Sequence, residues 1–227
     1  MQSLVFLLDV DNTLLDNDAI KEDWDKQLQA MVGPALSRKF WEIYEQVRRE
    51  QEVVDIPLAL SRLREEVPIT EMDEQTYQRI RTLFEDYPFY KKLYPDAIKT
   101  LEYLRSIGLT VIVSDGDQVF QAKKIVRSRL VDAVEGRVMI LTHKQEHLDE
   151  ITRVYPADHY VMIDDNPHIL HASKQIMRDR LTIVFVMQGH YAADPPPGGF
   201  APDLTVQHIG DLRNFGREKF LSNRGRN

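Results

Sequence analysis

Residues Leu4–Leu15 form the stretch LVFLLDVDNTLL, and the architecture of the chain can be worked out from it. The apolar run Leu4–Leu8 stops at Asp9, and a short apolar run bounded by polar turn formers predicts a strand buried on both faces. Because side chains alternate along a strand, Asp9 and Asp11 are expected to point the same way from its carboxyl end. In open parallel α/β sheets that end binds ligands. A divalent cation there would relieve the desolvation and mutual repulsion of the two carboxylates.

This Asp-x-Asp pair also has a simpler interpretation. Asp and Asn often begin an ordinary turn after a strand. The pair alone therefore does not distinguish a turn from a site, and the rest of the chain has to supply the distinction.

The composition narrows the class of protein. A chain of 227 residues with 43% hydrophobic residues suits one large domain, or a core with a smaller insert. The net charge of −7 argues against a nucleic-acid binder, and the absence of cysteine excludes disulfides, thiolate zinc sites and a cysteine nucleophile. No apolar stretch approaches the roughly 20 residues that span a bilayer, and the N-terminus makes a poor signal peptide. We expect a cytoplasmic protein without a membrane partner.

Residues 16–90 are predicted to form an all-helical domain inserted after the first strand. No convincing strand occurs there, and Gly33-Pro34 interrupts the first two helical stripes. We expect the aromatic residues of this segment to form its core and its arginines to lie on solvated helix faces, although one arginine could reach a substrate phosphate. The aromatic residues are Trp24, Trp41 and Tyr44, and the arginines are Arg48, Arg49, Arg62 and Arg64.

From Tyr94 onward, strands and helices alternate. This βαβα rhythm predicts an α/β fold, a Rossmann-like parallel sheet with helices on both faces, built from residues 1–15 and 91–227. A final helix is predicted from about Gly210 to Leu221. The later strands are predicted at residues 109–113, 137–141, 159–163, 181–186 and 204–206, and the helices between them at 118–130, 145–154 and 168–177.

Four predicted strands end in polar residues of catalytic type. They are Asp9 with Asp11, Ser114, Lys144, and Asp164 with Asp165. The ends of parallel strands lie on one edge, so these groups are expected to meet. Phosphoryl transfer suits this set, because Mg²⁺ prefers carboxylates, a lysine and a hydroxyl can hold phosphoryl oxygens, and a second carboxylate can move the proton.

In their order and spacing, these motifs resemble the haloacid dehalogenase (HAD) superfamily over nearly the whole chain. The most specific is the first, Asp9-Val-Asp11-Asn-Thr13, and the stretch from Tyr94 to Gly116 is similar too. The helical segment resembles the C1-type cap of the phosphatase and phosphoglucomutase branch. Such a cap closes over the site and excludes water.

The resemblance implies a role for each motif residue. Asp9 would be the nucleophile that forms an aspartyl-phosphate, Asp11 the general acid and base, and Lys144 the cation that neutralises nucleophile and phosphate. Ser114, with the amide of Asp115 or Gly116, would bind the phosphoryl group, Thr13 and Asn166 would be supporting residues, and Asp9, Asp11 (through its carbonyl), Asp164 and Asp165 would hold Mg²⁺.

One departure from the family pattern concerns the last motif. Many members carry another acidic residue about four positions after its first acid, where this chain has His168 and Ile169. Either Asn166 replaces the hydrogen bonds of that acid or Asp164 supplies its charge. The division of metal binding between Asp164 and Asp165 stays open.

Other residues compete for two of these roles. Lys123 and Lys124 lie mid-helix, about two turns beyond the strand that ends at Ser114, so Lys144 at its strand–helix junction is preferred. His143 and His147 are spaced i, i+4, as metal ligands can be, but no third ligand is near them and we expect exposed helix surface.

The expected activity is a magnesium-dependent phosphatase acting on a small phosphorylated metabolite. A sugar phosphomutase could use the same site. A dehalogenase would leave Asp11 and the Asp164-Asp165 pair without a use, and a non-catalytic binding protein would be expected to lose the nucleophile or the acid. The substrate stays open, as does the choice between monomer and homodimer.

Overall fold

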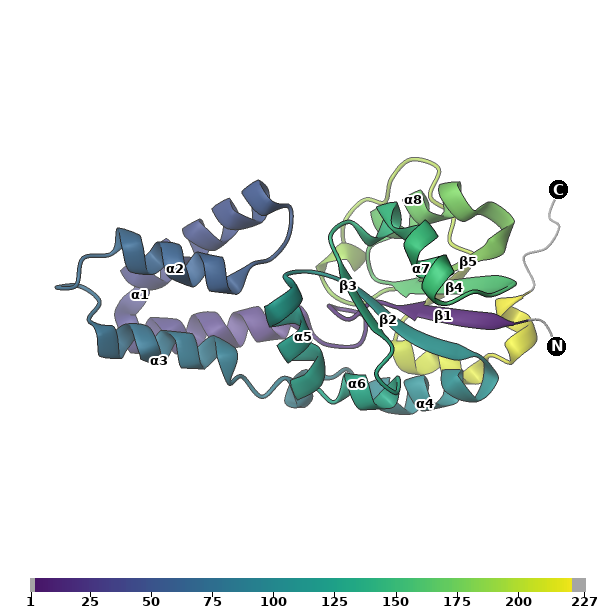
Figure 1. Cartoon of the computed structure of the whole chain (residues 1–227), viewed down its shortest axis with the longest axis horizontal. Coiled ribbons are helices and arrows are strands. Elements are labelled where there is room, and N and C mark those ends of the chain that lie inside the picture. Colours follow the sequence, from purple (N-terminus) through teal and green to yellow (C-terminus); the bar gives the residue numbers. More distant parts are fainter. Residues whose placement is uncertain (1–2, 222–227) are drawn as a thin grey trace.

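The computed structural model describes residues 3–221 and contains a six-stranded parallel sheet with the strand order β3-β2-β1-β4-β5-β6. Strand β1 lies in the middle of the sheet, with β2 and β4 as its parallel neighbours (Figure 1). The predicted α/β class and parallel sheet are confirmed. The strands are β1 (Leu4–Leu8), β2 (Leu109–Asp115), β3 (Val138–Leu141), β4 (His159–Asp164), β5 (Leu181–Val186) and β6 (Leu204–Val206).

Helices cover both faces of the sheet, and β1 is buried on both (Figure 1). Its residues alternate between two apolar clusters: Phe6 packs in the cluster that contains Leu104 of α4, and Leu7 packs in the cluster that contains Ile151 of α7. The uninterrupted apolar run of β1 follows from this two-sided burial. The helices of this part are α4 (Ala97–Ile107), α5 (Gln118–Arg127), α6 (Leu130–Ala133), α7 (Leu148–Val154) and α8 (Pro167–Met177).

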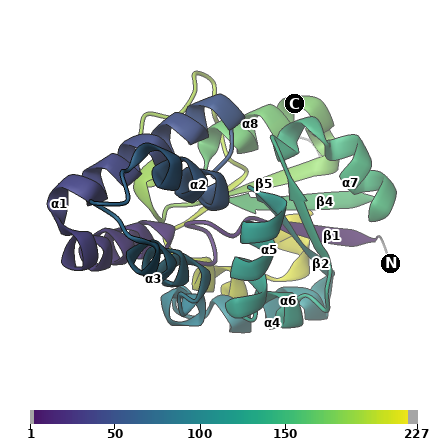
Figure 2. The same cartoon turned by 60° about the vertical axis from the view of Figure 1, so that its left-hand side comes forward.

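Three helices between β1 and β2 form a separate group beside the sheet, which we call the helical insert (Figures 1 and 2). They are α1 (Asn17–Gln51), α2 (Ile56–Glu66) and α3 (Glu74–Glu85). Helix α1 consists of two legs, because Gly33 leaves the helical conformation at φ 80° and Pro34 begins the second leg. The Asp25 carboxylate of the first leg accepts hydrogen bonds from Ser37 and Trp41 of the second.

Aromatic rings form much of the core of the insert. Trp24 and Tyr44 are buried, whereas Trp41 is half-buried. The centroid of the Trp24 ring lies 5.0 Å from that of Phe84 on α3 and 6.1 Å from that of Phe120 on α5, both in edge-on geometry. Because α5 belongs to the α/β part, Trp24 also joins the insert to that part. The predicted limits of the two parts, residues 16 and 90, stay a prediction, and residues 222–227 of the predicted core lie outside the described residues. No helix within residues 3–221 has the length and apolar character to cross a membrane.

The predicted final helix from Gly210 to Leu221 is wrong. The structure has two short 3₁₀ segments there, Ile209–Asn214 and Arg217–Phe220. Between them Phe215 and Gly216 are extended, and the Phe215 carbonyl accepts a hydrogen bond from the Tyr103 hydroxyl at 2.6 Å. A tertiary contact with α4 therefore replaces a helical hydrogen bond.

Two further helices are shorter than predicted because the backbone turns left-handed beside them. The helix predicted over 118–130 ends at Arg127, and Arg129 has a φ of 63°. The helix predicted from Gln145 begins at Leu148, after a 3₁₀ turn that follows His143 at φ 57°. In both places a single residue in the αL region ends or delays the helix.

Candidate active site

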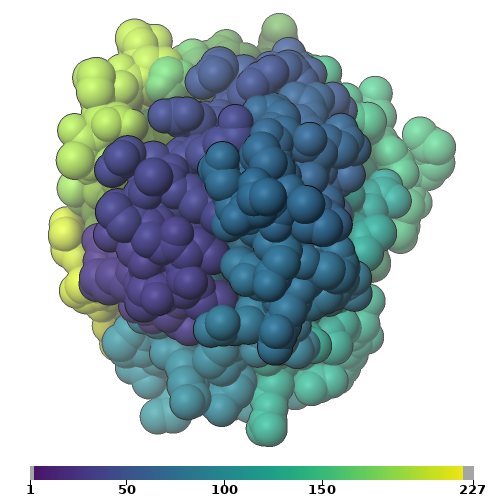
Figure 3. All heavy atoms as spheres, turned by 90° about the vertical axis from the view of Figure 1, so that its left-hand side faces the viewer, coloured from purple at the N-terminus to yellow at the C-terminus, as the bar shows by residue number. Residues whose placement is uncertain are grey.

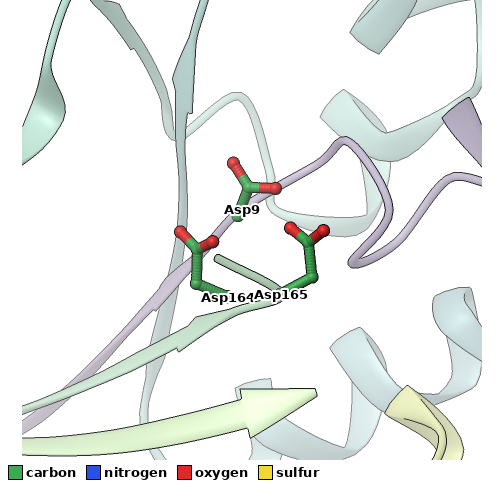
Figure 4. Close-up of side chains that lie close together, drawn as sticks. All are labelled: Asp9, Asp164 and Asp165. Carbon is green, nitrogen blue, oxygen red and sulfur yellow. The ribbon is translucent and has the colours of Figure 1, made fainter. Parts of the chain in front are cut away.

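Three carboxylates meet at the carboxyl ends of the two central strands. Asp9 follows β1, Asp164 ends β4, and Asp165 comes next, and each offers an oxygen within 4.8 Å of the others. Their side chains gather around one point in Figure 4. All three are buried, with exposed fractions of 8%, 1% and 3%. The pairing of β1 with β4 brings them together, and the Asp9 amide donates to the Ile163 carbonyl at 3.0 Å.

Lys144 supplies the positive charge next to this cluster. It lies in the 3₁₀ turn Lys144–Glu146 after β3, is almost fully buried, and places its Nζ 2.5 Å from Asp9 Oδ1 and 2.7 Å from Asp164 Oδ2. The Asp115 carboxylate accepts a hydrogen bond from the Lys144 amide at 2.8 Å. Asp115 therefore positions Lys144 through its side chain, a role that the sequence analysis did not assign to it.

The cluster has three carboxyl groups and one ammonium, so its carboxyl groups hold their protons to an unusually high pH. Burial raises the pKa of Asp9 to about 7 against the effect of Lys144. Burial, with Asp164 and Asp9 nearby, raises the pKa of Asp165 to about 10, and burial also raises the pKa of Asp164. Burial by itself would lower the pKa of Lys144, but the carboxylates of Asp164 and Asp9 have a larger effect, and the pKa of Lys144 is raised above its ordinary value. The site thus favours an additional positive charge.

The donor set fits a hard divalent cation. All candidate ligand atoms are carboxylate oxygens, which Mg²⁺ prefers. Within residues 3–221, Asp165 Oδ2 and Asp164 Oδ2 accept no hydrogen bond, and Lys144 Nζ forms an ion pair with Asp164 Oδ2 at 2.7 Å. Unused lone pairs on buried carboxylates are costly unless a cation takes them. Asp9, Asp164 and Asp165 are the residues that could hold such a cation.

The side chain of Asp11 is directed to a different partner. Its two carboxylate oxygens lie 2.7 and 3.0 Å from Lys124 Nζ, and Gln121 Nε2 donates to it at 3.1 Å. Lys124, the alternative candidate for the Lys144 role, thus contacts the second acid and not the nucleophile candidate. Metal binding by the Asp11 carbonyl stays a prediction.

Gln121 and Lys124 are site residues that the sequence analysis missed or misplaced. Both are buried on α5, three residues apart, and Gln121 also donates to Ser114 Oγ at 2.8 Å. The available signal was their spacing after the N-cap Asp117, since residues three apart share one helix face. That face points back at the strand end.

The predicted phosphate-binding group lies at the end of β2. Ser114 is buried there. The Gly116 amide donates to the Leu141 carbonyl of β3 at 3.1 Å, so it already serves the sheet. The Asp115 amide is therefore the better candidate of the two for binding phosphate.

Thr13 and Asn166 hold the acidic pair in place. The Asp165 amide donates to Thr13 Oγ1 at 3.1 Å. The Asn166 amide donates to Asp164 Oδ1 at 2.8 Å, and its side chain caps α8 by accepting from the His168 amide. These contacts suit the supporting roles expected of both residues.

The two histidines with i, i+4 spacing do not form a metal site with the described residues. His143 Nε2 lies 2.8 Å from Glu52 Oε2, at the end of α1, and His147 lies 3.5 Å from Glu150. The first contact joins the insert to the α/β part.

A cavity of about 400 Å³ lies between the helical insert and the ends of the strands. From the α/β part it is lined by Asp11, Asp115, Gly116, Gln121 and Lys124 among others, and from the insert by Lys21, Trp24, Tyr44 and Arg48 among others. Seen from the side of the insert, the residues of α1–α3 cover most of the molecule behind them (Figure 3). A ligand at the strand ends would be enclosed by both parts.

The chain belongs to the haloacid dehalogenase-like hydrolase family, whose model matches residues 4–175. Among solved structures, a haloacid dehalogenase-like hydrolase from Burkholderia xenovorans is 44% identical, with a TM-score of 0.87, and the match covers 96% of this chain and 99% of that one. A search of curated proteins found no match.

More distant structures share the fold. An HAD hydrolase from Bacillus subtilis bound to magnesium is 16% identical with a TM-score of 0.64, and the match covers 94% of this chain and 98% of that one. The L-2-haloacid dehalogenase from Xanthobacter autotrophicus, with chloropropionic acid covalently bound, is 16% identical with a TM-score of 0.63 and the same coverage. This chain is an HAD-like hydrolase, and its substrate class has to be argued from its own residues.

Proposed function

We propose that the protein is a magnesium-dependent phosphatase that hydrolyses a small phosphomonoester through an aspartyl-phosphate on Asp9. The observation that carries this proposal is the charge imbalance around Asp9. Three buried carboxylates share one lysine, and a metal would complete that site. Displacement of a halide requires neither a metal nor an acid at the leaving group, so Asp164, Asp165 and Asp11 favour phosphoryl transfer.

In the first step, Asp9 attacks the phosphorus atom. A bond forms between an Asp9 carboxylate oxygen and phosphorus while the bond from phosphorus to the alcohol oxygen breaks. The electron pair stays on the alcohol oxygen, which takes a proton from Asp11. Ser114 and Lys144 hold the remaining phosphoryl oxygens. Magnesium held by Asp9, Asp164 and Asp165 supplies charge that screens nucleophile and phosphate from each other.

In the second step, water replaces Asp9 on phosphorus. Asp11, now a carboxylate, takes a proton from the water, and the bond between phosphorus and Asp9 breaks to release inorganic phosphate. Lys124 and Gln121 fix the direction of the Asp11 carboxylate for both transfers. The insert over the cavity limits the entry of bulk water.

The test is hydrolysis of p-nitrophenyl phosphate with magnesium and with EDTA, beside release of chloride from 2-chloropropionate. We expect magnesium-dependent phosphate release that disappears in Asp9→Asn and is kept in Asp149→Asn, an exposed acid on α7. Chloride release that is independent of magnesium, without phosphate release, would overturn the proposal. Beryllium fluoride, which mimics a phosphoryl group, serves as a second probe of Asp9 if the aryl substrate does not fit.

A further inference from the structure

The helical insert brings two cations to the cavity opposite Asp11. Lys21 lies one turn after the start of α1, and Arg48 one turn before its end. Because α1 folds back at Gly33, both ends reach the same cavity, and both side chains line it. Arg48 is exposed, as the sequence analysis predicted, but helical spacing alone did not show that it also lines the cavity.

The charge of Lys21 has no close counterion. Lys21 makes no ion pair with any residue in the part of the chain that the structure describes, and its Nζ stands 5.3 Å from the centre of the Tyr44 ring. Burial and the charge of Arg48 lower the pKa of Lys21, and the more distant carboxylates of Glu45, Asp11 and Asp18 only partly oppose them. Arg48 forms an ion pair with Glu45 at 3.6 Å, and both side chains are more than two-fifths exposed.

The other lysine that lines the cavity, Lys124, has a counterion. Lys124 is buried, and both oxygens of Asp11 contact its ammonium. A partly buried ammonium is stable when an anion meets it, and for Lys21 no carboxylate within residues 3–221 lies at ion-pair distance. The missing anion can come from a ligand in the cavity.

On the basis of the proposed phosphatase function, we propose that the substrate carries a second anionic group on its alcohol part, and that Lys21 and Arg48 bind this group. The phosphoryl group binds at the strand ends, where Asp115 and Gly116 line the cavity, and the second anion lies against the insert. A carboxylate and a second phosphate share this chemistry. A cavity of about 400 Å³ suits a small substrate of this kind.

The first experiment compares two substrates of similar size with magnesium present, 2-phosphoglycolate and ethyl phosphate. Only the first has a second anion. We expect kcat/KM to be about tenfold to hundredfold higher for 2-phosphoglycolate, and this ratio to fall toward one in Lys21→Met and Arg48→Met. Ethanediol bisphosphate is the third substrate, and its rank against 2-phosphoglycolate shows which anion the cavity prefers.

Matched controls lie on the same helix. Lys26 is exposed and bonds to Glu22, and Arg49 neighbours Arg48, and neither lines the cavity. Lys26→Met and Arg49→Met should keep the substrate ratio. Equal kcat/KM for the two substrates in wild type, or an equal loss of the ratio in the controls, would overturn the anion site.

A binding measurement separates this proposal from the phosphatase proposal. Calorimetric titration of the Asp9→Asn protein with 2-phosphoglycolate and with ethyl phosphate does not depend on turnover. Tenfold tighter binding of 2-phosphoglycolate, lost on adding Lys21→Met, supports the anion site even if wild type hydrolyses neither compound. Turnover of both compounds together with equal binding would reject the anion site and leave the phosphatase proposal standing.

Discussion

The site lies between two walls, the strand ends and the helical insert, and these walls carry opposite excesses of charge. At the strand ends, Asp9, Asp164 and Asp165 surround the single ammonium of Lys144. On the insert, Lys21 has no ion pair within residues 3–221, and Arg48 has one partly exposed partner. Each wall is incomplete alone, because buried charge of one sign is unfavourable without a counterion. The comparison shows that one site can favour a bound cation at one wall and a bound anion at the other.

The largest effect should come from removing the cation of the acidic wall. Lys144→Met leaves Asp9 and Asp164 without their ion pairs, so we expect phosphatase activity to fall about 10³-fold and unfolding to cost about 3–5 kcal/mol less in the absence of metal. Urea unfolding and steady-state kinetics would measure the two effects. Lys123→Met, at an exposed lysine of α5, is the control. A Lys144→Met protein as active as wild type would contradict the role of Lys144.

A smaller loss of activity is expected when the ion pair between Lys124 and Asp11 is removed. Lys124→Met removes the group that orients Asp11, so kcat should fall about tenfold to hundredfold while KM changes little. Gln121→Leu should act in the same direction, since Gln121 contacts both Asp11 and Ser114. A rise of KM alone in both variants would show that these residues serve substrate binding.

The effect of magnesium on stability should grow with pH. The pKa of Asp9 is raised to about 7 and that of Asp165 to about 10, whereas both are about 4 in an unfolded chain. Between those limits the folded metal-free protein holds more protons than the unfolded one, so its stability falls as pH rises. Magnesium replaces those protons and should bind more tightly at higher pH.

Thermal unfolding with EDTA and with magnesium, at about pH 5 and at about pH 9, checks this expectation. The increase in Tm caused by magnesium should be larger at the higher pH, and Asp165→Asn should reduce the difference. An increase in Tm that is the same at both pH values would contradict this expectation, because metal binding would then not depend on the protonation of Asp9 and Asp165.

The smallest effect concerns the contact between the walls. Glu52 raises the pKa of His143 through their hydrogen bond. The contribution of the His143–Glu52 contact to the stability of the folded protein is therefore complete below the ordinary histidine pKa. It is lost as pH rises through the raised pKa of His143. Glu52→Gln should return the His143 titration, followed by NMR, to the ordinary range. His147, which pairs with Glu150, should be unaffected.

The sequence predicted the sheet and its acidic edge because both depend on local patterns. A run such as Leu4–Leu8 is apolar because each of its faces meets a core, and the residue after it falls at the sheet edge. The family resemblance, now confirmed by the family match, then named Asp9, Asp164 and Asp165, and the structure brings these three together. Their catalytic and metal roles remain predictions.

Contacts between distant parts of the chain were beyond these patterns. The pairing of Lys124 with Asp11 joins residues 113 positions apart. In the final segment, residues 210–221, a hydrogen bond between Phe215 and Tyr103 takes the place of the predicted helix. Helical spacing identifies the face of a helix that is polar, but it does not show whether that face meets water or a cavity. Arg48 is exposed as predicted, and its spacing gave no sign that it also lines the cavity.

The succession of strands along the chain, the parallel sheet and the acidic residues at its edge could therefore be predicted from short-range patterns, because burial on two faces makes consecutive residues apolar. The fold of α1 onto itself, the burial of Lys124 and the convergence of Lys21 with Arg48 on one cavity arise from packing between segments far apart in the chain. Charge balance in the site depends on those packed distances, because the energy of an ion pair falls with separation and rises with burial.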